Sequence, residues 1–283
     1  MSANLIQAHY YQQFDAACAA DVPASTYGGW KTAPIELAPQ RTAFVLMHAW
    51  DCCTPEQYPG WYRAVEGIPR MVGITRTVLP RLLEAVRASS ARLYHVAYPG
   101  RYYQHLPGYQ RTRALVPHEE EPQQIEVDPS LARLRAFRTE HVFVGKHNLK
   151  DVRAAFEKLD FAPQTRPRDD ERVVDTSAQL FAACRADGVN HLIYAGFTVN
   201  GCIVMMPGGM EDMRRHGILC SIIRQATTAI ENHQTAREEL AKQLGLWMVA
   251  LVYGFVFDLD DIIAWLDRLP RRKRSEAGAL SPA

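Results

Sequence analysis

The segment that most constrains this chain is residues 191–217, HLIYAGFTVNGCIVMMPGGMEDMRRHG. The apolar run 191–195 predicts a buried strand, Gly196 ends it, and a polar turn over 198–201 leads to Cys202 at the start of a predicted helix. Backbone amides at a helix N-terminus point outward, so they lower the pKa of a thiol there and can bind an oxyanion. This segment predicts a cysteine nucleophile at a strand-to-helix turn, whereas a cysteine taken alone is more often a small buried residue.

Elsewhere, short apolar runs alternate with amphipathic stretches. The predicted strands are 43–47, 92–97, 141–144, 191–195 and 219–223, and the predicted helices are 73–89, 176–187, 208–216 and 235–244. This alternation predicts an α/β fold in which helices cover both faces of a mostly parallel sheet, that is, a three-layer α/β/α sandwich.

Three segments lie outside that alternation. Residues 1–38 are aromatic-rich and irregular, and we expect this N-terminal arm to wrap the core or a neighbouring subunit. Residues 101–135 carry tyrosines, an acidic run and four prolines, and form a long excursion of the kind used for active-site covers or subunit contacts. Residues 271–283 are basic and then small and polar, which predicts a disordered tail after a single domain over 1–270.

Composition excludes several classes of protein. The chain has 283 residues, of which 47% are apolar, so it can bury one large core. The 32 Lys and Arg balance the 31 Asp and Glu, which gives no electrostatic case for nucleic acid or an anionic membrane as partner. No apolar run reaches the roughly 18–20 residues of a membrane span, and the N-terminus lacks the pattern of a secretory signal. Six cysteines without a C-x-x-C pair indicate reduced thiols in a cytoplasmic protein.

Two motifs carry a family resemblance. Gly196, Asn200 and Cys202 match the pattern G-x-x-x-N-x-C, and residues 224–235, RQATTAIENHQT, follow the next predicted strand. In these motifs the chain resembles the isochorismatase-like cysteine hydrolases, which include nicotinamidases and N-carbamoyl amidohydrolases, over residues 40–265. The resemblance implies a Rossmann-like α/β/α sandwich with a six-stranded sheet, a small-molecule substrate, and a homo-oligomer such as a dimer or tetramer.

The resemblance also implies a catalytic triad of Asp, Lys and Cys. Cys202 takes the place of the cysteine. In AFVLMHAWD, however, His48 stands where the family has its aspartate, and Trp50 and Asp51 match the WD that follows. An imidazole can take and return a proton near neutral pH, but it supplies no negative charge. The replacement therefore either retunes the chemistry or abolishes it. Asp51 could replace the missing carboxylate or orient His48, and a helix N-cap is an equal alternative.

The lysine of the triad has two candidates. Lys146, in HVFVGKHN, matches the lysine at the end of a strand, and a solvated loop lysine is the alternative reading. Lys150 is the second candidate, because its spacing to residues 155–156 resembles the family's Lys…Ser-Ala-Phe.

The oxyanion hole is predicted from the same resemblance. The family carries a non-proline cis peptide just before the cysteine turn, and its equivalent here is the Phe197–Thr198 bond. Backbone amides around Gly201 and Cys202 would complete the hole. Further pocket candidates are Trp50, Asp51, Asn200, Tyr102 and Tyr103.

The sequence offers no motif for a cofactor. No D-x-H pair occurs in residues 51–70 or 95–110, where zinc-binding relatives would carry one, and His48, His95 and His105 are scattered. The phosphate-binding patterns GxGxxG and GxxxxGK[ST] are absent as well. We therefore expect neither a metal nor a nucleotide cofactor.

These residues support hypotheses of different classes. The first is a hydrolase of a C–N bond in a small amide or N-carbamoyl compound, with Cys202 as nucleophile through a thioester, His48 as acid and base, and Lys146 stabilising charge. The second is a catalytically impaired relative that acts as a binding or assembly module. The third is a vinyl ether hydrolase of the isochorismatase type.

Overall fold

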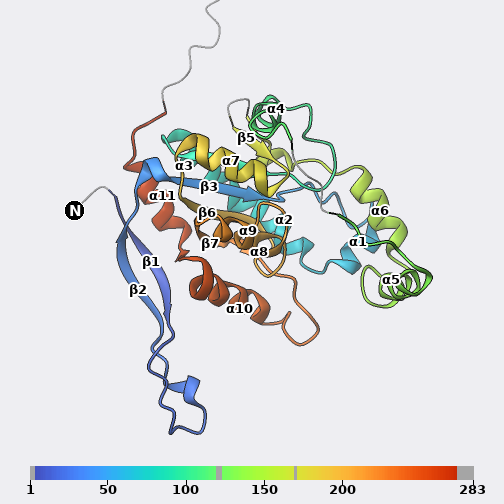
Figure 1. The fold of residues 1–283 in the computed structure, drawn as a ribbon, viewed down its shortest axis with the longest axis horizontal. Helices are drawn as coiled ribbons and strands as arrows, with labels where there is room; N and C mark the ends of the chain where they lie inside the picture. The colour runs from blue at the N-terminus through green and yellow to red at the C-terminus, as the bar shows by residue number, and fades with distance from the viewer. Residues whose placement is uncertain (1–3, 119–122, 169–170, 273–283) are drawn as a thin grey trace, which may run out of the picture.

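A computed structural model gives the structure of residues 4–118, 123–168 and 171–272 (Figure 1). Its centre is an eight-stranded sheet in the order β2-β1-β8-β7-β6-β3-β4-β5. Strands β3 to β8 pair in parallel with one another, whereas β1 pairs antiparallel with both β2 and β8. The strands are β1 (Leu5–Gln12), β2 (Gly29–Glu36), β3 (Thr42–Met47), β4 (Arg92–Val96), β5 (Arg172–Val174), β6 (His191–Phe197), β7 (Leu219–Thr228) and β8 (Val256–Phe257). The predicted mostly parallel α/β sheet is confirmed.

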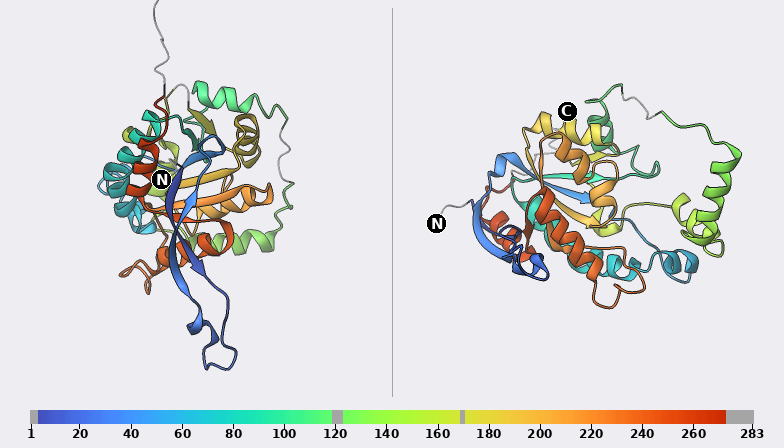
Figure 2. Two further views of the ribbon diagram at one scale, coloured as in Figure 1. Left: turned by 90° about the vertical axis from the view of Figure 1, so that its left-hand side faces the viewer. Right: turned by 60° about the horizontal axis from the view of Figure 1, so that its bottom comes forward.

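The predicted number of six strands is wrong, because the N-terminal arm is not irregular. Its strands β1 and β2 form an antiparallel hairpin that joins the sheet through β8 and makes eight strands in all. The far end of the hairpin extends away from the rest of the molecule, as the blue ribbon in Figures 1 and 2 shows. β2 is the edge strand and contains Pro34, a residue that central strands exclude because it has no N–H to donate.

Helices cover both faces of the sheet. The α-helices are α1 (Pro59–Ala64), α2 (Ile68–Thr77), α3 (Leu79–Ala88), α4 (Pro107–Arg113), α5 (Pro129–His141), α6 (Leu149–Glu157), α7 (Ser177–Asp187), α8 (Cys202–Met205), α9 (Met210–Arg215), α10 (Leu240–Met248) and α11 (Leu259–Asp267). The short helices are the 3-10 turns η1 (Pro23–Thr26), η2 (Pro39–Arg41) and η3 (Pro163–Thr165) and the π-helical turn η4 (Val249–Tyr253). One buried apolar cluster joins the sheet to α3 and α11, and a second joins its other face to α7, α8, α9 and η4. The three-layer sandwich is therefore also confirmed.

Local sequence explains the elements that frame the site. Every residue of β3 and β6 is buried, because these two strands are neighbours in the middle of a sheet that is covered on both faces. Helix α7 begins where the Thr176 hydroxyl accepts a hydrogen bond from the Gln179 amide, at 3.2 Å. It ends at Gly188, whose φ of 68° is left-handed and favours glycine.

Three predicted elements differ from the structure. The helix expected over 235–244 is α10, which begins at Leu240 and ends at Met248, because the Asn232 side chain accepts hydrogen bonds from the Gln234 and Thr235 amides and residues 233–239 form turns. The helix expected over 73–89 is divided between α2 and α3, since Pro80 stands at the start of α3. The strand expected over 141–144 does not form: α5 ends at His141 and Phe143 is exposed, while β5 takes the place beside β4. A four-residue apolar run has too little periodicity to separate a strand from a loop that lines a pocket.

Some expectations fall outside the described residues. These are the acidic run at 119–121 and most of the predicted tail, from residue 273 onward. Within the described ranges, no helix has the length and apolar character needed to cross a membrane.

Candidate active site

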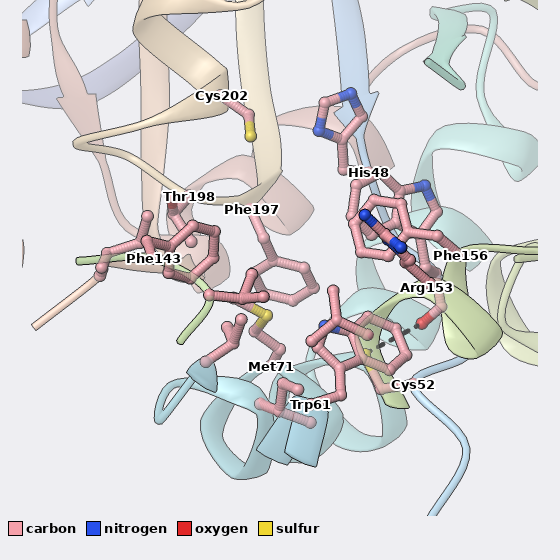
Figure 3. A pocket seen from close by; sticks show the side chains of 16 residues that line it. His48, Cys52, Trp61, Met71, Phe143, Arg153, Phe156, Phe197, Thr198 and Cys202 are labelled. Atoms are coloured by element: carbon pink, nitrogen blue, oxygen red, sulfur yellow. Dashed lines mark hydrogen bonds between the residues drawn. The ribbon is translucent and has the colours of Figure 1, made fainter. Parts of the chain in front are cut away.

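A cavity of about 330 Å³ opens where β3 and β6 end (Figure 3). Parallel sheets commonly place their sites at the carboxyl ends of the strands, where side chains from several strands converge. Its walls come from the loop after β3, from α1, α2 and α6, and from the segment before α6. They are almost wholly aromatic and aliphatic. The polar or charged exceptions that matter here are His48, Thr198, Cys202 and Arg153.

Two glycines shape the turn that carries the cysteine. At Gly196, φ is 103° and a Cβ would meet the Met47 carbonyl oxygen at 2.0 Å, so only glycine allows β6 to approach β3 this closely. The Phe197–Thr198 peptide bond is cis. At Gly201, a Cβ would meet Thr198 Oγ1 at 2.6 Å. The turn is therefore compact.

Asn200 supports the pocket wall. Its Nδ2 donates to the Ile230 carbonyl at 2.8 Å, and its Oδ1 accepts from the Ile230 amide at 2.9 Å. Ile230 lines the cavity, whereas Asn200 does not. This pair of hydrogen bonds connects the cysteine turn to the segment after β7.

The Cys202 thiol lies in the cavity at the start of α8. Burial raises the pKa of this thiol, and hydrogen bonds from the Thr198 and Cys202 backbone amides act in the opposite direction. The lowered thiol pKa expected from the helix terminus is wrong for this structure. α8 has only four residues, so its dipole is small beside the cost of removing a thiolate from water.

The same amides define where an oxyanion could bind. The Gly201 amide already donates to the Thr198 carbonyl at 3.1 Å, and so does the Ile203 amide. The amides directed at the Cys202 sulfur are those of Thr198 and Cys202 itself. An oxygen that develops charge next to that sulfur would meet these two donors first.

His48 follows β3 directly and adopts a left-handed backbone, with φ of 51°. Its ring stacks on Trp50 with 4.6 Å between centroids and an interplanar angle of 17°. The side chain is buried, and neither ring nitrogen has a hydrogen-bond partner among the described residues. Burial lowers the pKa of His48 to about 3, so the imidazole is neutral at pH 7. Figure 3 shows Cys202 and His48 at the same end of the cavity.

The structure does not bring the predicted lysines to this cavity. Lys146 forms an exposed ion pair with Glu140 at 2.9 Å. Both Lys146 and Lys150 line a separate surface hollow beside α6. The cation that does line the cavity is Arg153, also on α6.

Of the other pocket candidates, some lie at the cavity and others lie away from it. Trp50 lines the cavity and donates from its indole nitrogen to the Tyr102 hydroxyl at 2.9 Å, so Tyr102 lies behind the wall. Tyr103 is buried in a different cluster, with its hydroxyl on Asp175 at 3.0 Å. Asp51 accepts a hydrogen bond from the Cys53 amide and faces a neighbouring pocket instead.

Sequence reasoning missed several residues of this site. Arg153 and Phe156 on α6, and Phe143 and Val144 before it, line the cavity together with Trp61 of α1. The Phe143–Val144 bond is a second non-proline cis peptide. The only sequence signal for this part of the site is the spacing from Lys150 to residues 155–156, which places α6 near the cysteine. Among the described residues, no three His, Cys, Asp or Glu side chains gather as metal ligands would.

Comparisons with known proteins bear on the fold. No protein-family model and no curated protein matches the chain by sequence. Among solved structures, a cysteine hydrolase from Pseudomonas syringae pv. phaseolicola 1448A matches with a TM-score of 0.51 and 15% identity, covering 82% of this chain and 94% of that chain. An isochorismatase-like hydrolase from Alkaliphilus metalliredigens matches with a TM-score of 0.42 and 15% identity, covering 79% and 97% of the two chains. The Acinetobacter baumanii nicotinamidase matches with a TM-score of 0.40 and 14% identity, covering 79% and 99%.

At such low identity these similarities concern the fold alone. The chain has the isochorismatase-like α/β fold, with a sheet of eight strands that includes its N-terminal hairpin. The predicted resemblance is thus confirmed at the level of the fold.

Proposed function

We propose that this protein is a hydrolase that cleaves the C–N bond of a small amide or N-carbamoyl compound, with Cys202 as nucleophile. The observation that carries the proposal is the placement of Cys202 and His48 in one apolar cavity, at the ends of adjacent strands. Two backbone amides are directed at the sulfur, and neither nitrogen of the buried imidazole has a hydrogen-bond partner in the part of the chain that the structure describes.

The chemistry needs one proton carrier and one nucleophile. The Cys202 thiol passes its proton to His48, and the sulfur attacks the substrate carbonyl carbon. The Thr198 and Cys202 amides hold the resulting oxyanion. The C–N bond then breaks as His48 returns the proton to the departing nitrogen, which leaves a thioester. His48 next takes a proton from water, the hydroxyl oxygen attacks the thioester, and the C–S bond breaks to release the acid as His48 returns the proton to the sulfur and restores the thiol.

A specific observation favours the binding module as the second candidate. Burial raises the pKa of the Cys202 thiol and lowers that of His48 to about 3. Both shifts oppose a resting thiolate–imidazolium pair, because burial disfavours both charged forms and the two amide hydrogen bonds at the sulfur do not offset it. A pocket with these properties would suit the binding of an apolar ligand without turnover.

We further propose a homo-oligomer in the cytoplasm. Helix α10 and the turn η4 expose a row of apolar side chains at helical spacing, which a second copy of the chain would cover. They are Leu240, Leu244, Met248, Leu251 and Val252. The six cysteines are all free, as expected in a reducing compartment.

Release of ammonia from a panel of small amides and N-carbamoyl compounds tests the hydrolase. We expect Cys202→Ala to lower kcat/KM by about a thousandfold or more, because the covalent step is lost. The control is Cys18→Ser, at an exposed cysteine, which should leave the rate unchanged. Trapping substrate on the Cys202 peptide, detected by mass spectrometry, would identify the thioester. Equal turnover by wild type and Cys202→Ala would overturn the mechanism, and tight binding without turnover would favour the binding module.

A further inference from the structure

Helix α6 presents one charge to an otherwise apolar cavity. Three residues of α6 line the cavity: Val152, Arg153 and Phe156. Two of them are apolar like the cavity walls, whereas Arg153 is a cation on the same helix face. Across residues 4–118, 123–168 and 171–272, no hydrogen bond or ion pair reaches the Arg153 guanidinium, although Glu157 lies one turn further along the helix.

A second cation stands beside it. Lys150 is three residues earlier on α6, within side-chain reach of Arg153 on a helix surface, and it too has no ion pair within the described residues. Both side chains line the hollow next to the cavity, together with Lys146, whose charge Glu140 already neutralises. Arg153 is common to the hollow and the cavity. Arg153 therefore lies where the apolar cavity meets a hollow that also holds Lys150 and Glu157, and neither cation has an ion pair within the described residues.

We propose that Arg153, assisted by Lys150, binds a carboxylate on the substrate, so that the substrate is an apolar molecule with an anionic end. A planar guanidinium offers two parallel N–H donors that match a carboxylate, whereas an ammonium group adds attraction without fixed direction. The hydrocarbon part gains from leaving water for the aromatic walls. The position of the reacting carbonyl at Cys202 rests on the proposed function, whereas recognition of the carboxylate does not.

The sharpest test is binding without turnover. Binding of 4-phenylbutyrate and of its neutral analogue 4-phenylbutanamide to the Cys202→Ala protein is measured by isothermal titration calorimetry. We expect the carboxylate to bind about fivefold more tightly than the amide, a modest ratio because the guanidinium is partly in water. Added NaCl should reduce the ratio. Arg153→Gln should abolish it, Arg153→Lys should keep part of it, and Arg133→Gln, at an exposed arginine of α5, should leave it unchanged.

The outcomes separate this inference from the proposed function. Equal affinity for the two probes, no binding of either probe, or a preference that survives Arg153→Gln would overturn carboxylate recognition, even if the wild type hydrolyses neutral amides. Preference for the carboxylate that depends on Arg153, in a protein that hydrolyses nothing, would support the anion subsite and reject the hydrolase.

Discussion

At the level of single residues, His48 departs most from what its position implies. The sequence places it correctly at the end of β3, because an apolar strand that stops at a polar residue is a local pattern. The pKa of His48, by contrast, is set by the side chains that pack around it in the fold. Trp50 stacks on the ring and the surrounding walls exclude water, which lowers the pKa of His48 to about 3; both ring nitrogens lack a hydrogen-bond partner over residues 4–118, 123–168 and 171–272.

This burial predicts sensitivity to acid. The pKa of His48 is about 3 in the folded state against 6.5 for an ordinary histidine. As the pH falls below 6.5, His48 is protonated in the unfolded chain but stays neutral in the folded protein. The free energy of unfolding therefore falls by about 1.4 kcal/mol per pH unit until the pH reaches the pKa of the folded state. Above 6.5 both states are neutral and the effect vanishes.

His48→Gln should remove this contribution. We expect the fall in the free energy of unfolding between pH 7.5 and pH 5 to be about 2 kcal/mol smaller in His48→Gln than in wild type, as measured by urea denaturation. His105→Gln, at an exposed histidine, is the matched control. An identical loss in His48→Gln and wild type would mean that the folded protein protonates His48 freely.

Between elements, a buried charge cluster fixes the edge of the sheet that the sequence described least well. Glu171, just before β5, accepts from Arg87 of α3 at 2.6 and 2.8 Å and contacts His95 of β4 at 2.8 Å. Burial by itself would raise the pKa of Glu171, but the hydrogen bonds from Arg87 and His95 hold it well below its usual range. The cluster connects α3, β4 and β5. Strand β5 has only three residues, so its backbone hydrogen bonds alone could not make this connection.

Removing that carboxylate should destabilise the fold. Glu171→Ala leaves Arg87 and His95 without their partner, and we expect the free energy of unfolding at pH 7 to fall by about 3 kcal/mol. Because the carboxylate stabilises only while it is ionised, the difference from wild type should shrink as the pH falls below the ordinary pKa of a glutamate. Urea unfolding measures both effects, with Glu84→Ala, at an exposed residue of α3, as control. A change no larger than that of the control would show that the cluster contributes little.

At the scale of the whole molecule, two features extend beyond the sandwich. The β1–β2 hairpin extends from one edge of the sheet, and α5 lies at the periphery on the other side, with no buried residue of its own (Figure 2). α10 packs against the hairpin through Trp247, which donates to Gln13, and exposes its apolar row to solvent. Monomeric proteins rarely expose a contiguous apolar row of this kind to water, which is why we propose that a second copy of the chain covers it.

Leu244 lies within this row and is 59% exposed, so its replacement should leave the subunit folded. We expect Leu244→Asp to shift the protein from a dimer or larger assembly toward the monomer, as measured by size-exclusion chromatography with light scattering. A buried carboxylate would have no partner across the contact. Leu115→Asp, at another exposed leucine, should leave the mass unchanged. A monomeric wild type, or an assembly indifferent to Leu244→Asp, would contradict the proposed contact.

The sequence by itself determined the α/β class, the turn that carries Cys202, and the place of His48 at the end of a strand. Each follows from local patterns: apolar runs, a glycine and a polar turn that end a strand, and a polar residue where another strand stops. Only the tertiary structure decided that Arg153 and not Lys146 faces the cavity, that burial raises the pKa of Cys202, and that the arm pairs with the sheet. These depend on which distant segments pack together and how much water they exclude, and neither quantity is present in a local pattern.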